Sequence, residues 1–129
     1  MDDFDIVIRG GTVVNSNHTG RYDIGIRGET IVALAENLKG GRKEVDAGGL
    51  LIFPGGIDSH VHLEQPSGAA TISDDFASGT QSAAFGGNTM VLTFGLQPKG
   101  GSIKQAEADY RASAQLKTYL DFNFLLILY

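Results

Sequence analysis

Two of the three histidines in the chain stand two residues apart, within the segment "FPGGIDSHVHLEQP" that covers residues 53 to 66. Side chains with this spacing on a strand point to the same face, so we expect His60 and His62 to project side by side, with Asp58 one step before them. Imidazole is a common ligand for zinc and similar metals. The spacing therefore predicts a pair of metal ligands, and two histidines hydrogen-bonded within a core are the alternative that this short motif leaves open.

The carboxylate of Asp58 is a candidate partner for this pair. A ligand imidazole usually donates its second ring N–H to a carboxylate, a carbonyl oxygen or water, and this bond fixes the orientation of the ring. Asp58 could accept such a bond from one of the two histidines. A structural role within the strand accounts for Asp58 equally well.

The histidine pair must be positioned by the strand that carries it and by the elements that follow. An apolar stretch over residues 49–63 is typical of a buried strand, and similar stretches cover residues 88–96 and 121–129. The segments between them have helix-forming composition, and each is preceded by side chains that can cap a helix. The order strand, helix, strand, helix, strand predicts an α/β protein that begins a parallel layer or barrel.

The N-caps of the two expected helices can be named. Asp74 or Asp75 precedes the first helix, and Ser102 precedes the second, which is rich in Ala, Glu, Gln and Lys. In α/β barrels the active site lies at the carboxyl ends of the strands. Because His60 and His62 lie at the end of the first expected strand, they occupy the place where such barrels build their sites.

The first fifty residues have a different pattern, with short apolar runs separated by glycine-containing turns. Ile24 and Ile26 alternate with polar or small residues, which is typical of a sheet with one buried face. We expect antiparallel pairing in this region. The chain is therefore divided into an N-terminal β-sandwich part, residues 1–50, and a βα part, residues 51–129.

Composition excludes several classes of protein. The chain has 129 residues, 42% of them hydrophobic, with a net charge of −5 and no cysteine. Its ten Lys and Arg residues are scattered, whereas a nucleic-acid surface needs a basic stripe. No apolar run approaches the roughly 18 residues of a membrane span, and the start lacks the pattern of a signal peptide. We expect a cytoplasmic protein with no nucleic-acid or membrane partner.

The motifs of the chain, taken together, resemble a known family. "PGGIDSHVHLEQP", followed by "DDFASGTQSAAFGGNT", is similar to the start of the cyclic amidohydrolases of the dihydropyrimidinase and D-hydantoinase group. The segment "VDAGGLLIFPGGID", which begins at Val45, resembles the passage from that family's small β-sandwich into its first barrel strand. The resemblance covers essentially the whole chain, and it implies a small antiparallel β-sandwich unit followed by the start of a (β/α)8 barrel.

The resemblance also implies a chemistry. Members of the group hold a binuclear metal centre, usually zinc, and open a cyclic amide, such as a dihydropyrimidine or hydantoin ring, to an N-carbamoyl amino acid. His60 and His62 match two of the metal ligands. The bridging carboxylated lysine, two further histidines and the catalytic aspartate belong to later barrel strands, so no catalytic residue is expected within this chain. A homotetramer and a small cyclic amide substrate are the implied partners.

Individual positions favour some branches of the superfamily over others. Dihydroorotases carry an arginine where this chain has Glu64, and an asparagine in an "MPN" run where this chain has "VLTFGLQP". A glutamate there would repel a substrate carboxylate, so a dihydroorotase is disfavoured. An allantoinase fits poorly because the same asparagine is absent. Collapsin response mediator proteins have lost metal ligands in this motif. Because His60 and His62 are both present, an enzyme lineage is favoured.

The loop after the histidines departs from the hydantoinase pattern. Many members have a phenylalanine that contacts the exocyclic group of the substrate, where this chain has Ser67. Ser67 and Gln65 are therefore candidate substrate-loop residues, and a solvated loop explains them equally well.

The length of the chain limits what it can do by itself. A (β/α)8 barrel takes about 250 residues, so residues 51–129 would be its first two and a half βα units, and the chain is expected to be truncated. We expect the isolated chain to be inactive. The alternative function is a non-catalytic fragment or scaffold homologue that keeps the histidine pair without independent activity.

Overall fold

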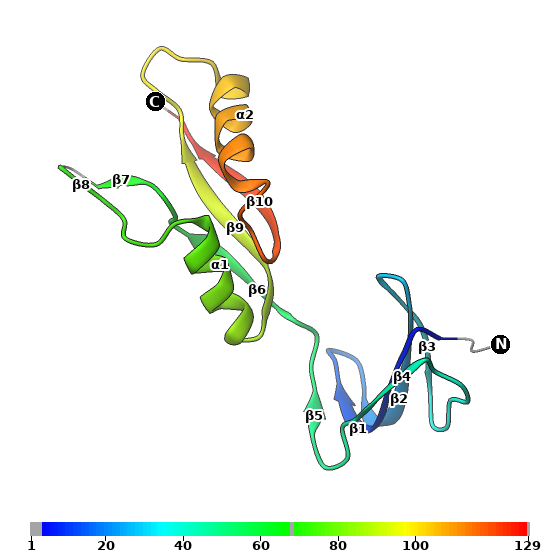
Figure 1. Cartoon of the computed structure of the whole chain (residues 1–129). Coiled ribbons are helices and arrows are strands. Elements are labelled where there is room, and N and C mark those ends of the chain that lie inside the picture. The colour runs from blue at the N-terminus through cyan, green and yellow to red at the C-terminus, as the bar shows by residue number, and fades with distance from the viewer. Residues whose placement is uncertain (1–3, 68, 129) are drawn as a thin grey trace. The chain divides into compact units, whose positions relative to one another are not determined.

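The computed structural model describes residues 4–67 and 69–128, and it divides the chain into two compact units (Figure 1). The first unit ends at Pro54 and the second begins at Gly55. The expected boundary at residue 50 is displaced because Leu51 and Ile52 form a short strand that pairs with the first strand of the chain. The apolar stretch expected as one strand over residues 49–63 is thus divided between the two units.

The first unit is a single five-stranded sheet in the order β3-β2-β1-β4, with β5 also paired to β1. Its strands are β1 (Ile6–Val14), β2 (Thr19–Arg27), β3 (Thr30–Ala35), β4 (Lys43–Asp46) and β5 (Leu51–Ile52). The expected antiparallel pairing holds for β1, β2 and β3. It is wrong for β4, which runs parallel to β1, and β5, which lies beyond residue 50, is also parallel to β1. The loop 36–42 carries the chain past β2 and β1 to the other edge of the sheet, and apolar alternation does not record the direction of pairing.

A buried carboxylate organises this sheet. Asp23 is 6% exposed, and its two oxygens accept hydrogen bonds from the backbone N–H of Gly10, at 2.9 Å, and of Leu38, at 3.1 Å. The guanidinium of Arg9 donates to the same carboxylate at 3.1 Å. Gly10 has φ of +68°, and the β1–β2 register shifts between Ile8 and Gly11. Asp23 therefore holds an irregular segment of β1 against the β3–β4 loop.

The second unit has the predicted order of strands and helices. It comprises β6 (Gly56–Val61), a small hairpin of β7 (Pro66–Ser67) and β8 (Ala70–Thr71), α1 (Phe76–Phe85), β9 (Asn88–Leu96), α2 (Ile103–Ala114) and β10 (Asp121–Ile127). The strands β6, β9 and β10 form a parallel sheet with β9 at its centre. The unit is therefore an α/β layer with two βα steps, and only the β7–β8 hairpin was not expected from the sequence.

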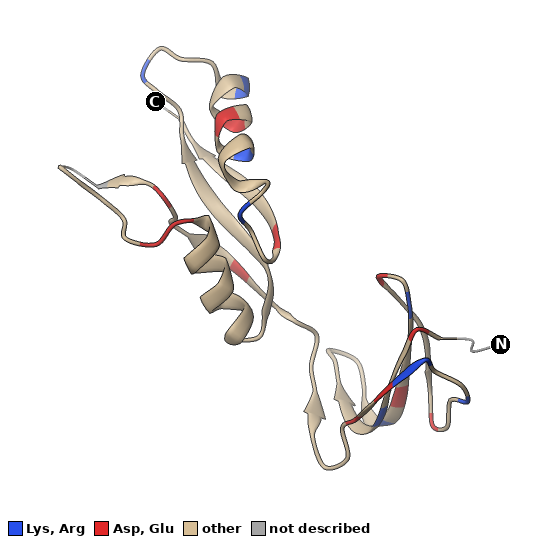
Figure 2. Ribbon diagram, in the orientation of Figure 1, with Lys and Arg blue, Asp and Glu red and all other residues tan. Residues whose placement is uncertain are grey.

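The two helices begin at the predicted caps. The carboxylate of Asp75 accepts a hydrogen bond from the N–H of Ser78 at 2.7 Å, and the hydroxyl oxygen of Ser78 accepts one from the N–H of Asp75 at 3.1 Å, which completes a capping box. Ser102 caps α2. Figure 2 shows that α1 is free of charged residues, whereas α2 carries charges of both signs.

Both helices pack on the same face of the sheet. One cluster joins Leu63 after β6, Phe76 of α1 and Ala114 of α2, with Phe122 and Phe124 of β10 packed against it. In β9 the alternate residues Val91 and Thr93 are buried. No helix among the described residues is long and apolar enough to span a membrane.

The opposite face of the sheet is not covered by the described residues. The strand β6, expected as a buried strand, is exposed along its length up to Val61, which alone is partly buried. The reason is geometric, since β6 is an edge strand and Val61 is its one residue that packs against the cluster on the helix side. The exposed face is the one that carries the histidines.

Candidate metal centre

His60 lies in β6, and His62 lies directly after its last residue. Their ring centroids are 5.3 Å apart. Both rings contact the ring of Phe94 in the neighbouring strand β9, with centroids 4.6 Å from His60 and 4.9 Å from His62. The two imidazoles therefore lie side by side on one face of the sheet, as the two-residue spacing predicts.

Phe94 is a part of the site that the sequence analysis did not single out. Its ring is nearly parallel to that of His62, at 12°, and tilted by 52° to that of His60. It alternates along β9 with the buried Thr93, so period-two spacing places it on the uncovered face. The alternation along β9, together with the pairing of β9 beside β6, was the signal that could have identified Phe94 as part of the site.

Gln65 contacts the Nδ1 edge of the His62 ring. Its side-chain Oε1 lies 2.6 Å from Nδ1 of His62, and the residue is 3% exposed. The two atoms are within hydrogen-bond distance, and which ring nitrogen carries the proton depends on the tautomer of His62. The substrate-loop role expected for Gln65 stays a prediction, while its observed contact is with a histidine.

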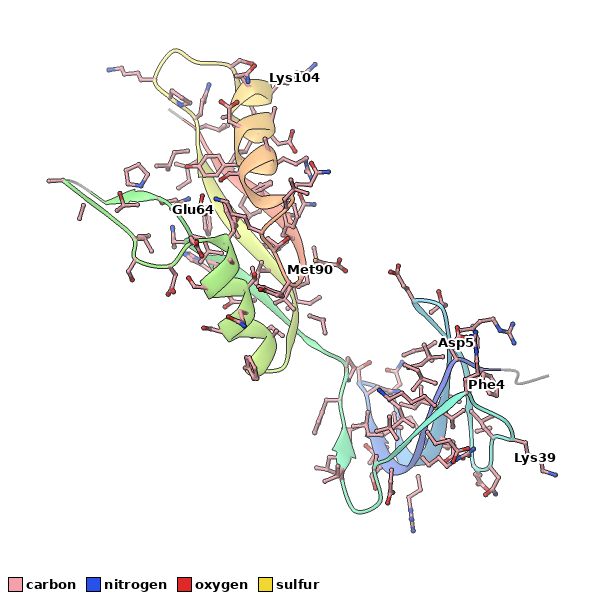
Figure 3. All side chains as sticks on the ribbon, in the orientation of Figure 1. Phe4, Asp5, Lys39, Glu64, Met90 and Lys104 are labelled. Atoms are coloured by element: carbon pink, nitrogen blue, oxygen red, sulfur yellow. The ribbon has the colours of Figure 1, made fainter. Side chains whose placement is uncertain are left out.

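Glu64 forms the turn that brings Gln65 back toward His62. It has φ of +53°, a left-handed conformation that is uncommon for residues other than glycine. Its carboxylate accepts hydrogen bonds from the N–H of Phe76 at 3.2 Å, from the hydroxyl of Ser113 at 2.7 Å and from the ammonium of Lys117 at 2.7 Å. Figure 3 shows Glu64 beside α1. The loop is thereby tied to the beginning of α1 and to the end of α2.

The ionisation of Glu64 follows from these contacts. Burial acts to raise the pKa of this carboxyl, but the hydrogen bonds from Lys117, Ser113 and Phe76 outweigh burial, and the net effect lowers the pKa. Glu64 is therefore a carboxylate engaged with the helices. The expected repulsion between Glu64 and a substrate carboxylate assumed a side chain that faces the histidines, and the structure instead pairs it with Lys117.

Asp58 and Ser67 are placed as follows. The carboxylate of Asp58 accepts a hydrogen bond from the backbone N–H of His60 at 3.1 Å. The β6–β9 register shifts between Asp58 and Val61, so β6 has one more residue than β9 at this point. The expected bond from Asp58 to a ligand imidazole stays a prediction. The backbone of Ser67 belongs to β7, and its side chain lies outside the described residues.

The donor set fits part of a metal centre. Two imidazoles side by side on one face are suitable ligands for zinc and similar ions. Among the described residues no group of three or more His, Cys, Asp or Glu side chains gathers to complete the set. The pair can thus contribute two ligands to a centre that needs more.

Comparison with known proteins supplies the context of this pair. No protein-family model matches the chain. The D-hydantoinase of Geobacillus stearothermophilus is 38% identical over 123 residues, which are 95% of this chain and 26% of that protein. The solved D-hydantoinase from Bacillus sp. AR9 superposes with a TM-score of 0.91 at 43% identity, and the dihydropyrimidinase from Brevibacillus agri with a TM-score of 0.91 at 41% identity. Each superposition covers 95% of this chain and 27% of the other.

The chain is a homologue of the D-hydantoinase and dihydropyrimidinase group. It spans about a quarter of the length of the relatives that it matches. A third relative, the allantoinase of Rubrobacter xylanophilus, is also 38% identical, over 124 residues covering 95% of this chain and 27% of that protein. Identity therefore does not separate this D-hydantoinase homologue from allantoinases, and the poor fit to allantoinases expected from the sequence stays a prediction.

Proposed function

We propose that this chain contributes the first two metal ligands, His60 and His62, to a cyclic amidohydrolase that opens dihydropyrimidine or hydantoin rings to N-carbamoyl amino acids. The observation that carries this proposal is the pair of imidazoles placed side by side at the end of the first strand of a parallel sheet, in a chain homologous to D-hydantoinases. A carboxyl-terminal strand edge is where α/β barrels assemble their active sites.

The architecture of the second unit supports a barrel. The strands β6, β9 and β10 are parallel and adjacent in chain order, and both helices lie on one face of the sheet. In a (β/α)8 barrel the helices cover the outside and the other face of the sheet turns inward. In the proposed enzyme the second unit forms the first two and a half βα units, and the face that carries His60, His62 and Phe94 lines the interior.

The proposed centre holds two metal ions, with zinc as the expected metal. Bound metal would supply a hydroxide near neutral pH and polarise the carbonyl group of the ring amide. The residues of this chain bind and orient: His60 and His62 each offer one ring nitrogen, and Phe94 packs against both rings. The bridging lysine, the further histidines and the aspartate would come from other parts of the enzyme, for which we propose a homotetramer.

A hybrid enzyme tests the function. This chain replaces the matching segment of the Geobacillus stearothermophilus D-hydantoinase, and hydantoin and dihydrouracil hydrolysis are measured together with metal content. We expect metal-dependent ring opening by the hybrid. His60→Ala and His62→Ala should each abolish it, because each removes a metal bond. His18→Ala should retain it, because His18 contacts Tyr22 in the first unit.

The hybrid also separates the two candidate functions. A folded hybrid that binds metal and turns over neither substrate would favour the non-catalytic scaffold homologue. A hybrid that stays active after loss of either histidine would contradict the ligand assignment. The 129-residue chain by itself is expected to show no turnover even with added zinc.

A further inference from the structure

The contact between Gln65 and His62 bears on which ring nitrogen of the histidine can bind a metal ion. The amide oxygen of Gln65 lies 2.6 Å from Nδ1 of His62. Because that oxygen can only accept, the ring proton belongs on Nδ1, and the lone pair belongs on Nε2. A metal ion binds an imidazole through the nitrogen that has no proton.

We propose that Gln65 is a positioning residue, which holds His62 in the tautomer protonated at Nδ1 and so makes Nε2 its metal-binding atom. The part of this proposal that concerns metal rests on the proposed function. The hydrogen bond itself is a property of the metal-free chain and can be tested separately. Gln65 here has the role that a carboxylate or backbone carbonyl often has beside a ligand histidine.

The backbone around Gln65 is built to hold its side chain in place. Glu64, in its left-handed conformation, turns the chain so that a residue three positions after His62 returns to the ring. The carbonyl of Gln65 then accepts the N–H of Ile72 at 2.9 Å, and the N–H of Glu64 donates to the carbonyl of Asp74 at 3.0 Å. The backbone that carries the Gln65 side chain is thus held by hydrogen bonds at both residues of the turn.

A burial cost also points to this role. Among the buried side-chain atoms that the structure describes, the amide nitrogen of Gln65 has no hydrogen-bond partner, and the residue is 3% exposed. A buried polar group without a partner costs free energy that an apolar side chain of the same size would not. If the amide were reversed, its nitrogen would donate to Nδ1 and the ring proton would move to Nε2. His62 would then have no ring nitrogen available to bind a metal ion. The observed orientation keeps the ligand and leaves the amide nitrogen without a partner.

The ring is restrained in two further ways. Phe94 lies against its face at 12°, with a centroid distance of 4.9 Å, and His60 lies 5.3 Å away. Stacking limits the tilt of the ring, whereas a hydrogen bond to a ring nitrogen selects the tautomer, and the contact with Gln65 is at Nδ1. Gln65 is therefore the residue whose removal should change the protonated nitrogen.

The first test uses histidine ring ¹⁵N spectra of the metal-free 129-residue chain above the pKa of imidazole. We expect His62 protonated at Nδ1 in the wild-type chain and in Gln65→Glu, which keeps an acceptor. In Gln65→Met, which keeps the length of the side chain and loses the acceptor, the Nε2-protonated form should appear. Gln81→Met, at an exposed position of α1, is the matched control and should leave His62 unchanged.

The second test measures Zn²⁺ affinity of the same proteins by calorimetry. Loss of such a partner typically weakens metal binding roughly 10–100-fold, so Gln65→Met should bind Zn²⁺ correspondingly more weakly, and Gln65→Glu should not. A role in packing alone predicts the reverse order, since methionine fills a buried site better than a carboxylate does.

The outcomes are distinguishable. The proposal is overturned if His62 of the wild-type chain is protonated at Nε2, or if the tautomer is unchanged in Gln65→Met. If Gln65→Met does not fold, the wild-type spectrum alone decides whether His62 is protonated at Nδ1. Unchanged Zn²⁺ affinity in Gln65→Met overturns the positioning of the ligand. If the tautomers follow the expected order and the hybrid enzyme binds no metal, the proposed metal centre is wrong and the tautomer assignment to Gln65 is supported.

Discussion

The ring of Phe94 stacks on the imidazole of His62, with 4.9 Å between the centroids and 12° between the planes. The two residues come from neighbouring parallel strands, β9 and the end of β6. The same ring also contacts His60. Phe94 is therefore the side chain that both histidines share, and it holds them on one face of the sheet.

Replacing Phe94 tests this shared contact. Phe94→Leu should lower the free energy of unfolding by about 1 kcal/mol, because the aromatic pairs are lost, and it should change the ring resonances of both His60 and His62. Phe122→Leu is the matched control, since Phe122 packs on the helix-covered face. It should cost comparable stability and leave the histidine resonances in place. Equal effects of both variants on the histidine rings would contradict the shared contact.

Three variants test the attachment of Glu64 to the helices. Lys117→Met removes a partly exposed ion pair and should cost about 0.5 kcal/mol of unfolding free energy. Ser113→Ala should cost about 1 kcal/mol, and Glu64→Ala about 2 kcal/mol, because it removes all three hydrogen bonds of the carboxylate. Denaturant unfolding measures the series.

Lys104→Met provides the control for this series, as an exposed lysine at the other end of α2. It should change the unfolding free energy by less than about 0.5 kcal/mol. A Glu64→Ala protein as stable as the wild type would show that the turn is held by the backbone alone.

The buried carboxylate Asp23 makes the stability of the first unit depend on pH. Burial acts to raise its pKa, but hydrogen bonds from Gly10, Leu38 and Arg9 outweigh burial, and the net effect lowers the pKa below the ordinary value of 3.8. A carboxyl with a lowered pKa in the folded state stabilises that state above the unfolded-state pKa. This stabilisation is lost as the pH falls through the folded-state pKa.

Asp23→Asn should therefore lower the unfolding free energy at pH 7 by about 3 kcal/mol, since it places an amide group against three donors. The difference from the wild type should stay constant above about pH 5 and shrink as the pH falls below about 4. Asp121→Asn, at an exposed position of β10, should show neither effect. A difference that grows on acidification would refute the assigned role of Asp23.

The sequence predicted those features that depend on local periodicity. The placement of His60 and His62 on one face follows from a spacing of two, and the caps Asp75 and Ser102 follow from their chemistry next to helix-forming runs. The strand and helix order of the second unit was predicted for the same reason.

Other features depend on contacts between distant residues and left no local signal. The pairing of Glu64 with Lys117 joins residues 53 positions apart, and the return of Gln65 to His62 needs a left-handed glutamate. The parallel pairing of β4 with β1 depends on the path of a loop. The exposure of β6 depends on which strands of the sheet the helices cover, and an apolar run of residues does not record this.

The assignment of His60 and His62 as metal ligands is the central claim, and a zinc titration followed by histidine ring NMR of the wild-type chain tests it most directly. The third histidine, His18, lies in the other unit and serves as the internal control. We predict that the ring resonances of His60 and His62 move together with rising Zn²⁺ while those of His18 stay in place, with Nε2 of His62 showing the shift of a metal-bound nitrogen. Resonances of His60 and His62 that do not move, or that move no more than those of His18, would contradict the account.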